Sequence, residues 1–227
     1  MKDITKNDFF YVVDDNYDEH IDLAIPFYKE MHNEISNFLN IEIKSPKVLD
    51  LGCGTGVTTS AVLDFYPHAE VIAIDLFAEM LNHAKKRLVN YNEQITYIQG
   101  DFRETDWESN IDICISSLAL HHILPNEKKQ LFDKIYKTLN DDGIFIMIDW
   151  TKFNSNNIQR KAFENAEKHA NKSVANKQIV EDWTYHWENI NIPDTIEDLI
   201  GWLKNSGFRN VNCVFRYYGL AMIIAEK

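Results

Sequence analysis

The sequence predicts a doubly wound α/β fold, with helices on both faces of a parallel sheet. Two features of the 227-residue chain predict it. Short apolar runs, of the kind found in strands buried on both faces, alternate with segments of helical periodicity. The first apolar run ends in a glycine-rich turn directly before a helical segment. Because such folds bind ligands at the carboxyl ends of their strands, polar residues at those ends are the first candidates for function.

The elements of this sheet follow one another along the chain. The predicted strands, each a short apolar run, are residues 48–51, 71–74, 95–98, 111–116 and 144–148. The predicted helices between them are residues 57–65, 78–89 and 128–139. Residues 140–143, Asn-Asp-Asp-Gly, form the predicted turn before the fifth strand. Right-handed crossovers would join the strands into one parallel sheet.

Two further segments flank this core. An apolar stripe predicts one helix over residues 17–39. After residue 150 the chain becomes polar and rich in Asn, with one long helical stretch, and it then shows a helix at 195–205 capped by Gly207 and strands at 211–215 and 220–225. The chain is thus divided into a helical cap (1–45), an α/β core (46–150), a helical insertion over the substrate site (151–194) and a C-terminal helix and hairpin (195–227).

Charge and cysteine content limit the function classes. The chain has 23 Lys and Arg against 35 Asp and Glu, a formal net charge of -12 that repels phosphate backbones and argues against nucleic-acid substrates. Cys53, Cys114 and Cys213 lie far apart and form no C-x-x-C pair, which suits a reducing compartment and offers no zinc site. The N-terminus lacks a signal-peptide core and no apolar run has the length of a membrane span, so we expect a cytoplasmic protein without membrane contact. The sequence leaves open whether the chain forms a homodimer.

The central motif is the glycine loop of residues 50–56, Asp-Leu-Gly-Cys-Gly-Thr-Gly, between the first strand and its helix. Glycines allow the loop to turn tightly and let a ligand lie against the backbone. Asp75, at the end of the second strand, has the spacing at which an acid binds ribose hydroxyls. A dinucleotide fingerprint would need glycine where Val57 stands, and Asp50 directly before the loop suits an ammonium or sulfonium better than a pyrophosphate. These residues disfavour an NAD-linked oxidoreductase.

Residues 50–56 resemble the first motif of class I S-adenosylmethionine (SAM)-dependent methyltransferases. Further segments resemble later family motifs in the family's order: 71–75, 100–102, 112–122, 140–148 and the hairpin after Gly207-Phe208. The resemblance covers roughly residues 17–227. It implies a Rossmann-like sheet of seven strands with the last strand antiparallel. We therefore expect an enzyme that transfers a methyl group from SAM to a small molecule by in-line displacement, leaving S-adenosylhomocysteine (SAH), without a metal.

The resemblance also implies the residues that bind the cofactor. Asp75 would bind the ribose, Asp101 the adenine amino group, and Phe102 would cover the adenine ring. The other expected cofactor residues are Asp50, Gly52, Cys53, Gly54, Gly56, Leu76, Met80, Ser117 and Tyr17. Cys53 is interpreted as a small loop filler rather than a nucleophile. Tyr17, like Tyr11, lies in a segment that folds over the cofactor in many relatives, and it would either contact the methionine carboxylate or be a surface turn residue.

Two histidines and an acid are candidates for chemistry on the acceptor. His121 and His122 follow the fourth strand, where one could take a proton from an oxygen or nitrogen acceptor. The other interpretation, that they cap a helix or bond a loop carbonyl, is favoured for His121 and more strongly for His122, because many relatives use no base. His121 is nevertheless the catalytic candidate, as a base or an orienting group, and His122 a substrate contact. Asp149, at the end of the fifth strand, would touch the substrate or cap the loop.

An aromatic cluster in the insertion is the remaining candidate for substrate binding. It comprises Trp183, Tyr185, His186 and Trp187. These rings would either roof an aromatic or cationic acceptor or attach the insertion to the sheet. Trp183 and Trp187 are the two expected substrate contacts.

One subgroup of the family is similar in more detail. Tyr17-Asp18, His121-His122 and Gly207-Phe208 follow the order seen in the subgroup that contains the carboxy-SAM synthase of tRNA modification. That enzyme holds the extra carboxylate with an arginine on its late helix, and the matching place here, near Trp202, has none. We therefore expect ordinary methyl transfer, with carboxy-SAM synthesis and a non-catalytic SAM-binding module as alternatives.

Overall fold

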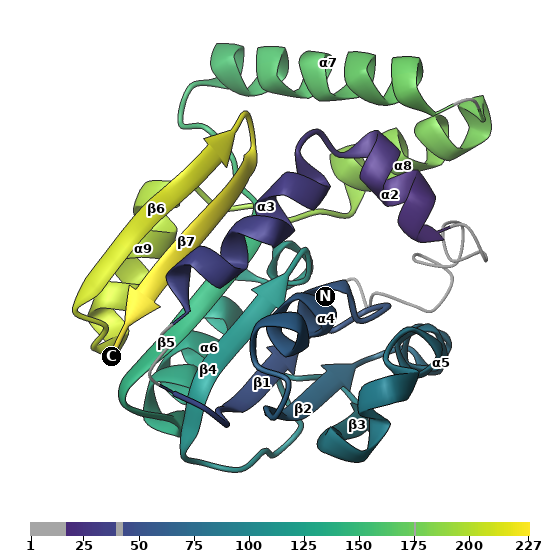
Figure 1. The fold of residues 1–227 in the computed structure, drawn as a ribbon. Coiled ribbons are helices and arrows are strands. Elements are labelled where there is room, and N and C mark those ends of the chain that lie inside the picture. The colour runs from purple at the N-terminus through teal and green to yellow at the C-terminus, as the bar shows by residue number, and fades with distance from the viewer. Residues whose placement is uncertain (1–16, 40–42, 175) are drawn as a thin grey trace.

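A seven-stranded sheet forms the centre of the computed structural model, which describes residues 17–39, 43–174 and 176–227, and its strand order is β3-β2-β1-β4-β5-β7-β6 (Figure 1). The strands are β1 (Lys47–Leu51), β2 (Glu70–Asp75), β3 (Ile95–Gln99), β4 (Ile111–Ser117), β5 (Leu139–Trp150), β6 (Asn210–Tyr217) and β7 (Leu220–Glu226). Pairing is parallel from β3 to β5, and β7 is antiparallel to both neighbours. The predicted α/β sheet of seven strands with an antiparallel last strand is confirmed.

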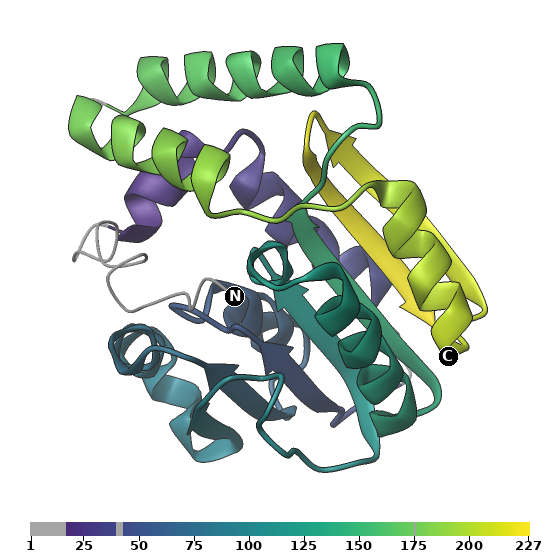
Figure 2. The same cartoon turned by 180° about the vertical axis from the view of Figure 1, so that it is seen from behind.

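Helices cover both faces of this sheet (Figures 1 and 2). They are α2 (Tyr17–Ala24), α3 (Tyr28–Glu34), α4 (Val57–Phe65), α5 (Ala78–Arg87), α6 (Pro125–Thr138), α7 (Asn156–Ser173), α8 (Lys177–Asn189) and α9 (Ile196–Ser206), with short 3-10 turns η1 (Ile35–Phe38), η2 (Val89–Gln94) and η3 (Leu120–His122). Successive residues of β1 point to opposite faces, so Val48 joins the core under α4 and α5 whereas Leu49 joins the core under α6 and α9. Both faces are therefore buried, which explains the continuous apolar runs.

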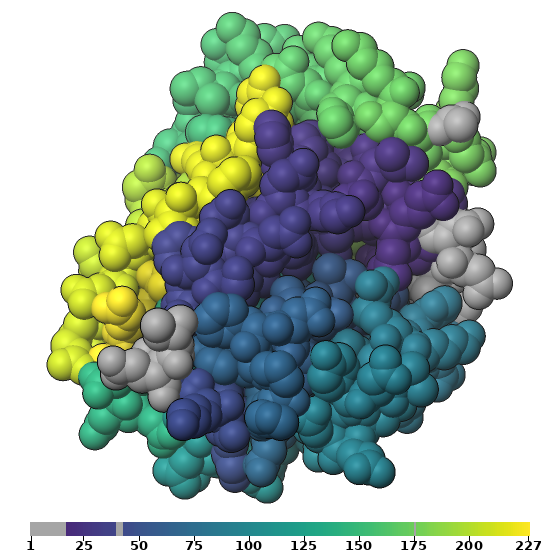
Figure 3. Space-filling view, viewed as in Figure 1, coloured from purple at the N-terminus to yellow at the C-terminus, as the bar shows by residue number. Residues whose placement is uncertain are grey.

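The single helix predicted over residues 17–39 is wrong, because the chain breaks at Pro26. Proline has no N–H for a helical hydrogen bond, and the next residue, Phe27, adopts a positive φ of 62°. The break lets α2 leave α3 and pack against α7. Figure 3 shows α2 and α3 filling the space between the insertion and the core helices.

Two more boundaries differ from the prediction. Residues 140–143 lie inside a strand instead of before it: β5 begins at Leu139, opposite Ile111, and its pairing with β4 resumes at Ile144, opposite Ile113. The residues between them form a bulge in β5, where Asp142 has a φ of 66°. The insertion contains two helices, α7 and α8, rather than one. Asn176 caps α8 with its side chain, which accepts a hydrogen bond from the Gln178 backbone at 3.0 Å.

Candidate functional site

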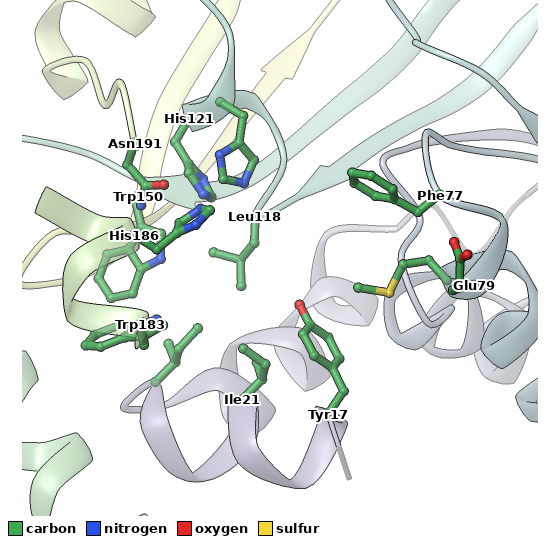
Figure 4. A pocket seen from close by; sticks show the side chains of 13 residues that line it. Tyr17, Ile21, Phe77, Glu79, Leu118, His121, Trp150, Trp183, His186 and Asn191 are labelled. Carbon is green, nitrogen blue, oxygen red and sulfur yellow. The ribbon is translucent and has the colours of Figure 1, made fainter. Parts of the chain in front are cut away.

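Two adjoining cavities lie at the carboxyl ends of the central strands. The first, here the loop cavity, measures about 180 Å³ and is bordered by the glycine loop, Asp75 and Phe102. The second, here the histidine cavity, measures about 130 Å³ and is bordered by His121, His122 and Trp183 (Figure 4). Tyr17, Ile21, Phe77, Met80, Leu118 and His122 line both. A ligand in the loop cavity would therefore lie next to one in the histidine cavity.

Most of the predicted cofactor residues border the loop cavity. These are Tyr17, Gly52, Cys53, Gly54, Asp75, Leu76, Met80, Phe102 and Ser117. The Ser117 hydroxyl is held by the His32 ring at 2.9 Å, so α3 helps to position this wall. Burial raises the pKa of the Cys53 thiol well above its usual value, which suits a loop filler better than a nucleophile. Tyr11 lies outside the described residues.

The three glycines of the loop have different tasks. Gly52, Gly54 and Gly56 all have positive φ, at 72°, 54° and 82°. A Cβ on Gly52 would lie 2.5 Å from that of Ala119, and one on Gly56 would lie 2.9 Å from the Leu88 side chain. A Cβ on Gly54 would meet no atom within 4 Å. Gly54 therefore borders open space, whereas Gly56 serves the packing of the loop against α5 and does not border either cavity.

Asp50 is buried beneath the loop, borders neither cavity and has an incomplete set of hydrogen bonds. The Thr59 hydroxyl donates to Oδ2 at 2.6 Å, while Oδ1 is buried and has no partner among the described residues. Burial raises the pKa of this carboxyl to about 7, against the opposing effect of the Thr59 hydrogen bond. A cationic group on a ligand would compensate a charge that is otherwise unfavourable here.

Asp75 is held at the end of β2 by backbone N–H groups, including those of Gly54 and Phe77. Gly54 donates its N–H to Oδ2 at 2.8 Å, and Phe77 donates to Oδ1 at 2.9 Å. Burial raises the pKa of this carboxyl although both hydrogen bonds oppose it. Because each carboxylate oxygen keeps a second lone pair, Asp75 can still accept hydroxyl donors from the loop cavity.

Asp101 is placed differently from its neighbours in the predicted set. Arg103 donates to both oxygens of its carboxylate, at 3.0 Å each from Nε. Burial alone would raise the pKa of Asp101, but the Arg103 hydrogen bonds outweigh it and hold the pKa below the usual range. Neither cavity is bordered by Asp101, whereas the adjacent Phe102 borders the loop cavity. The adenine contact assigned to Asp101 stays a prediction.

His121 and Asp149 form a buried pair at the wall of the histidine cavity. Nδ1 of His121 is hydrogen-bonded to Oδ1 of Asp149, and the His121 backbone N–H donates to Oδ2 at 3.0 Å. The Trp150 N–H donates to Oδ1 at 2.7 Å, which fixes the carboxylate further. An Asp149 carboxylate that accepts from Nδ1–H leaves Nε2 as the basic nitrogen of the ring. His121 is thus oriented by a carboxylate instead of capping a helix.

The other rings divide between the cavity and the packing of the insertion. His122 and His186 border the histidine cavity with ring centroids 5.2 Å apart, and burial lowers the pKa of His122 well below its usual value. Trp183 borders the cavity and also packs 6.1 Å from Trp150. Trp187, on α8 of the insertion, packs between Trp150 and Phe163, with ring centroids 4.1 Å and 5.8 Å away, and borders neither cavity. Trp187 therefore attaches the insertion to the sheet. Trp183 does this too, and it also borders the histidine cavity.

Several residues that border the site were missed by sequence reasoning, and Leu118, Glu79 and Asn191 matter most among them. Leu118 borders both cavities with a φ of 51°, an unfavourable conformation for a leucine that no local pattern signals. Glu79 and Asn191 border the histidine cavity, and each carries a buried oxygen without a partner among the described residues. Asn191 comes from the chain after α8, where the Ile192 N–H donates to the His121 carbonyl at 2.6 Å.

Trp202 does not lie where the comparison with carboxy-SAM synthase needs it. It is on α9, where the Lys129 ammonium sits 4.9 Å from its ring, and it borders neither cavity. The absence of an arginine at this position therefore does not distinguish methyl transfer from carboxy-SAM synthesis. Arg209 and Arg216 are also absent from both linings, and the described residues that border the two cavities include no arginine or lysine.

Neither a cluster of metal ligands nor a membrane-spanning helix is present among the described residues. Across residues 17–39, 43–174 and 176–227 no three His, Cys, Asp or Glu side chains are grouped so as to hold a metal ion. No helix in the same ranges has both the length and the apolar character needed to cross a membrane.

The chain is similar to known proteins over most of its length. Residues 48–143 match a family model described as a methyltransferase domain. Carboxy-S-adenosyl-L-methionine synthases of Helicobacter hepaticus and Campylobacter lari are 28% and 26% identical to it over 93% of this chain and 90% of their own.

Solved structures show the same fold. Human N-acetylserotonin methyltransferase in complex with SAM matches with a TM-score of 0.59 and 19% identity over 88% of this chain and 52% of its own. PigF with SAH matches with a TM-score of 0.63 and 18% identity over 88% of this chain and 56% of its own. The chain spans about half the length of these two structures, and at such identities they show the fold alone.

Proposed function

Because the chain belongs to the class I SAM-dependent methyltransferase superfamily, we propose that it transfers a methyl group from SAM to a small molecule bound in the histidine cavity. One observation carries the proposal. Asp50 keeps a buried oxygen without a partner at the base of the glycine loop, and the amino group of SAM is the cation that would compensate it.

The residues of the loop cavity fit the other parts of this cofactor. Asp75 would accept the ribose hydroxyls with its remaining lone pairs, and Phe102 would lie against the adenine. Tyr17 would donate to the methionine carboxylate, since burial and the nearby Asp18 and Asp75 raise its pKa and keep the hydroxyl protonated. Gly54 leaves open the space against the backbone that a ligand needs.

His121 would act on the acceptor. Bound SAM supplies an electrophilic methyl group: the acceptor's lone pair forms the new bond to carbon as the carbon–sulfur bond breaks, leaving the neutral thioether of SAH. Nε2 of His121 would accept the proton that the acceptor loses, and Asp149 would stabilise the resulting imidazolium through Nδ1. If the acceptor needs no base, the His121 ring, held by Asp149, would position the acceptor instead.

Titration calorimetry with SAM tests the proposal at Asp50. Asp50→Asn keeps the shape of the side chain but removes its charge, so we expect SAM affinity to fall about 30-fold, the loss of one charge-assisted hydrogen bond. Asp64→Asn, on the exposed surface of α4, is the matched control and should bind SAM normally. Equal SAM binding by wild type and Asp50→Asn would contradict the assignment. Radiolabelled methyl transfer to a pool of small molecules then tests the reaction itself.

A second candidate is carboxy-SAM synthesis, which is favoured by the identity of 26–28% to synthases over nine tenths of the chain. Against it stands the lining of both cavities, which offers no arginine or lysine among the described residues for an extra carboxylate. Mass spectrometry of the nucleoside released from purified protein distinguishes the two. SAM or SAH supports methyl transfer, and the carboxylated derivative would support the synthase.

A further inference from the structure

The histidine cavity offers two hydrogen-bond acceptors that nothing in the described chain satisfies. Oε2 of Glu79 and Oδ1 of Asn191 are both buried and have no partner there. They come from opposite walls: Glu79 from the first turn of α5 and Asn191 from the chain after α8 (Figure 4). Leaving a buried acceptor unsatisfied is unfavourable, because its hydrogen bond to water is lost and not replaced. A ligand with hydrogen-bond donors would satisfy both.

The charge of the lining favours a cation over an anion. Glu79 is the acidic side chain among the described residues of this cavity, and no lysine or arginine accompanies it. His122 does not supply the missing positive charge, because burial lowers its pKa well below the usual value. A carboxylate bound here would meet Glu79 without a compensating charge, whereas an ammonium group would pair with it.

The shape and the remaining walls favour a single aromatic ring. Trp150, Trp183, Phe77 and Tyr17 place four aromatic side chains around the cavity. Such rings stack on flat ligands and attract cations through their faces. The volume of about 130 Å³ is close to the roughly 150 Å³ of a cavity that holds one benzene molecule.

We propose that the acceptor bound in the histidine cavity is an arylalkylamine with one aromatic ring, held as an ammonium cation by Glu79 and hydrogen-bonded by Asn191. The assignment rests on the proposed methyltransferase function and names its substrate class. It also opposes the synthase alternative, because a substrate that brings an extra carboxylate would be disfavoured by the same lining.

Matched phenols test the charge preference directly. Tyramine, 4-ethylphenol and 4-hydroxyphenylacetate share a ring and differ in bearing an ammonium group, no charge or a carboxylate. We expect calorimetry on the full chain saturated with SAH to give an affinity for tyramine about tenfold above that for 4-ethylphenol, with 4-hydroxyphenylacetate weakest. In Glu79→Gln, tyramine and 4-ethylphenol should bind alike. Glu70→Gln, an exposed residue at the start of β2, is the matched control and should keep the wild-type order.

Three results would overturn the proposal: no binding of tyramine, an affinity for 4-hydroxyphenylacetate equal to or above that for tyramine, or an unchanged preference in Glu79→Gln. Thermal unfolding of each variant shows that it is folded. The SAH titration is read separately in the same samples. Loss of SAH binding would therefore refute the methyltransferase function, and the amine titration on the protein alone would still decide the class of ligand.

Discussion

The loop cavity and the histidine cavity adjoin, yet the chain builds them in different ways. The loop cavity is formed largely by residues at the carboxyl ends of β1 and β2, close in sequence to one glycine motif. The histidine cavity combines α2, η3, α8 and the segment around Asn191, which are far apart in the chain. The loop cavity therefore depends mainly on short segments at the ends of two neighbouring strands. The histidine cavity depends on contacts between segments that are distant in the chain.

The largest effect is expected where the insertion is attached to the core. Lys128 on α6 is 2% exposed, and its ammonium donates to Asp194 at 2.5 Å and to the Ile192 carbonyl at 2.6 Å. Lys128→Met leaves Asp194 buried without its partner, so the free energy of unfolding should fall by about 3–5 kcal/mol in urea denaturation. The double variant Lys128→Met/Asp194→Leu should recover most of this loss. A loss below about 1 kcal/mol in the single variant would show that the pair does not hold the segment.

A substitution in the glycine loop is expected to lower both the stability of the protein and ligand binding in the loop cavity. Gly52→Ala combines a φ of 72° with a Cβ 2.5 Å from that of Ala119, so we expect a loss of about 3 kcal/mol in the free energy of unfolding, together with weaker SAH binding. Gly201→Ala is the control, because Gly201 lies in α9 and an added Cβ would meet nothing within 4 Å. That variant should gain up to about 1 kcal/mol. Equal stability of both variants would contradict the predicted strain.

The pH dependence of SAM binding separates Asp50 from the acceptor side. The Asp50 carboxyl has a pKa of about 7, so below this pH it must lose a proton before it can pair with the amino group of SAM. SAM affinity should therefore fall as the pH drops below about 7 and level off near the roughly 30-fold loss expected for Asp50→Asn, since protonated Asp50 is likewise uncharged. The folded state holds this proton up to pH 7 whereas the unfolded state loses it near pH 4, so the contribution of Asp50 to stability falls as pH rises between these values.

Calorimetry and urea denaturation between pH 5 and pH 8 check both trends against Asp50→Asn, in which both should disappear. A SAM affinity that rises on acidification would overturn the assigned protonation state.

The smallest effect is expected at the contact between α2 and the glycine loop. Asp18 on α2 accepts from the Thr55 hydroxyl at 2.5 Å and is ion-paired with Arg87, which also donates from Nε to the Thr55 carbonyl at 2.9 Å. These side chains are partly exposed, so Asp18→Asn should change the free energy of unfolding by less than about 1 kcal/mol. SAH should dissociate a few times faster in stopped-flow measurements, because α2 is held less firmly over the loop. Asp22→Asn, exposed on the same helix, should leave the rate unchanged.

Periodicity and spacing predicted the alternation of strands and helices, and the resemblance to the methyltransferase family implied the seven-stranded sheet and most of the residues that border the loop cavity. An apolar run buried on both faces and a glycine turn are local consequences of covalent structure, so a short stretch of residues is enough to predict them. The same holds for Asp75, whose position after β2 follows from the strand itself. The helix over residues 17–39 was mispredicted because its apolar stripe continues past Pro26, and the cost of proline in a helix outweighs that periodicity.

The acceptor side was settled by folding. His121 and Asp149 are 28 residues apart and pair only because β4 and β5 are neighbours in the sheet. Glu79 and Asn191 show no pattern that distinguishes them from other polar residues, and the burial that makes their oxygens significant exists only once α2 and the insertion close over the strand ends. Burial and unpaired charge depend on residues distant in the chain, so these features became visible in the folded molecule and not in its sequence.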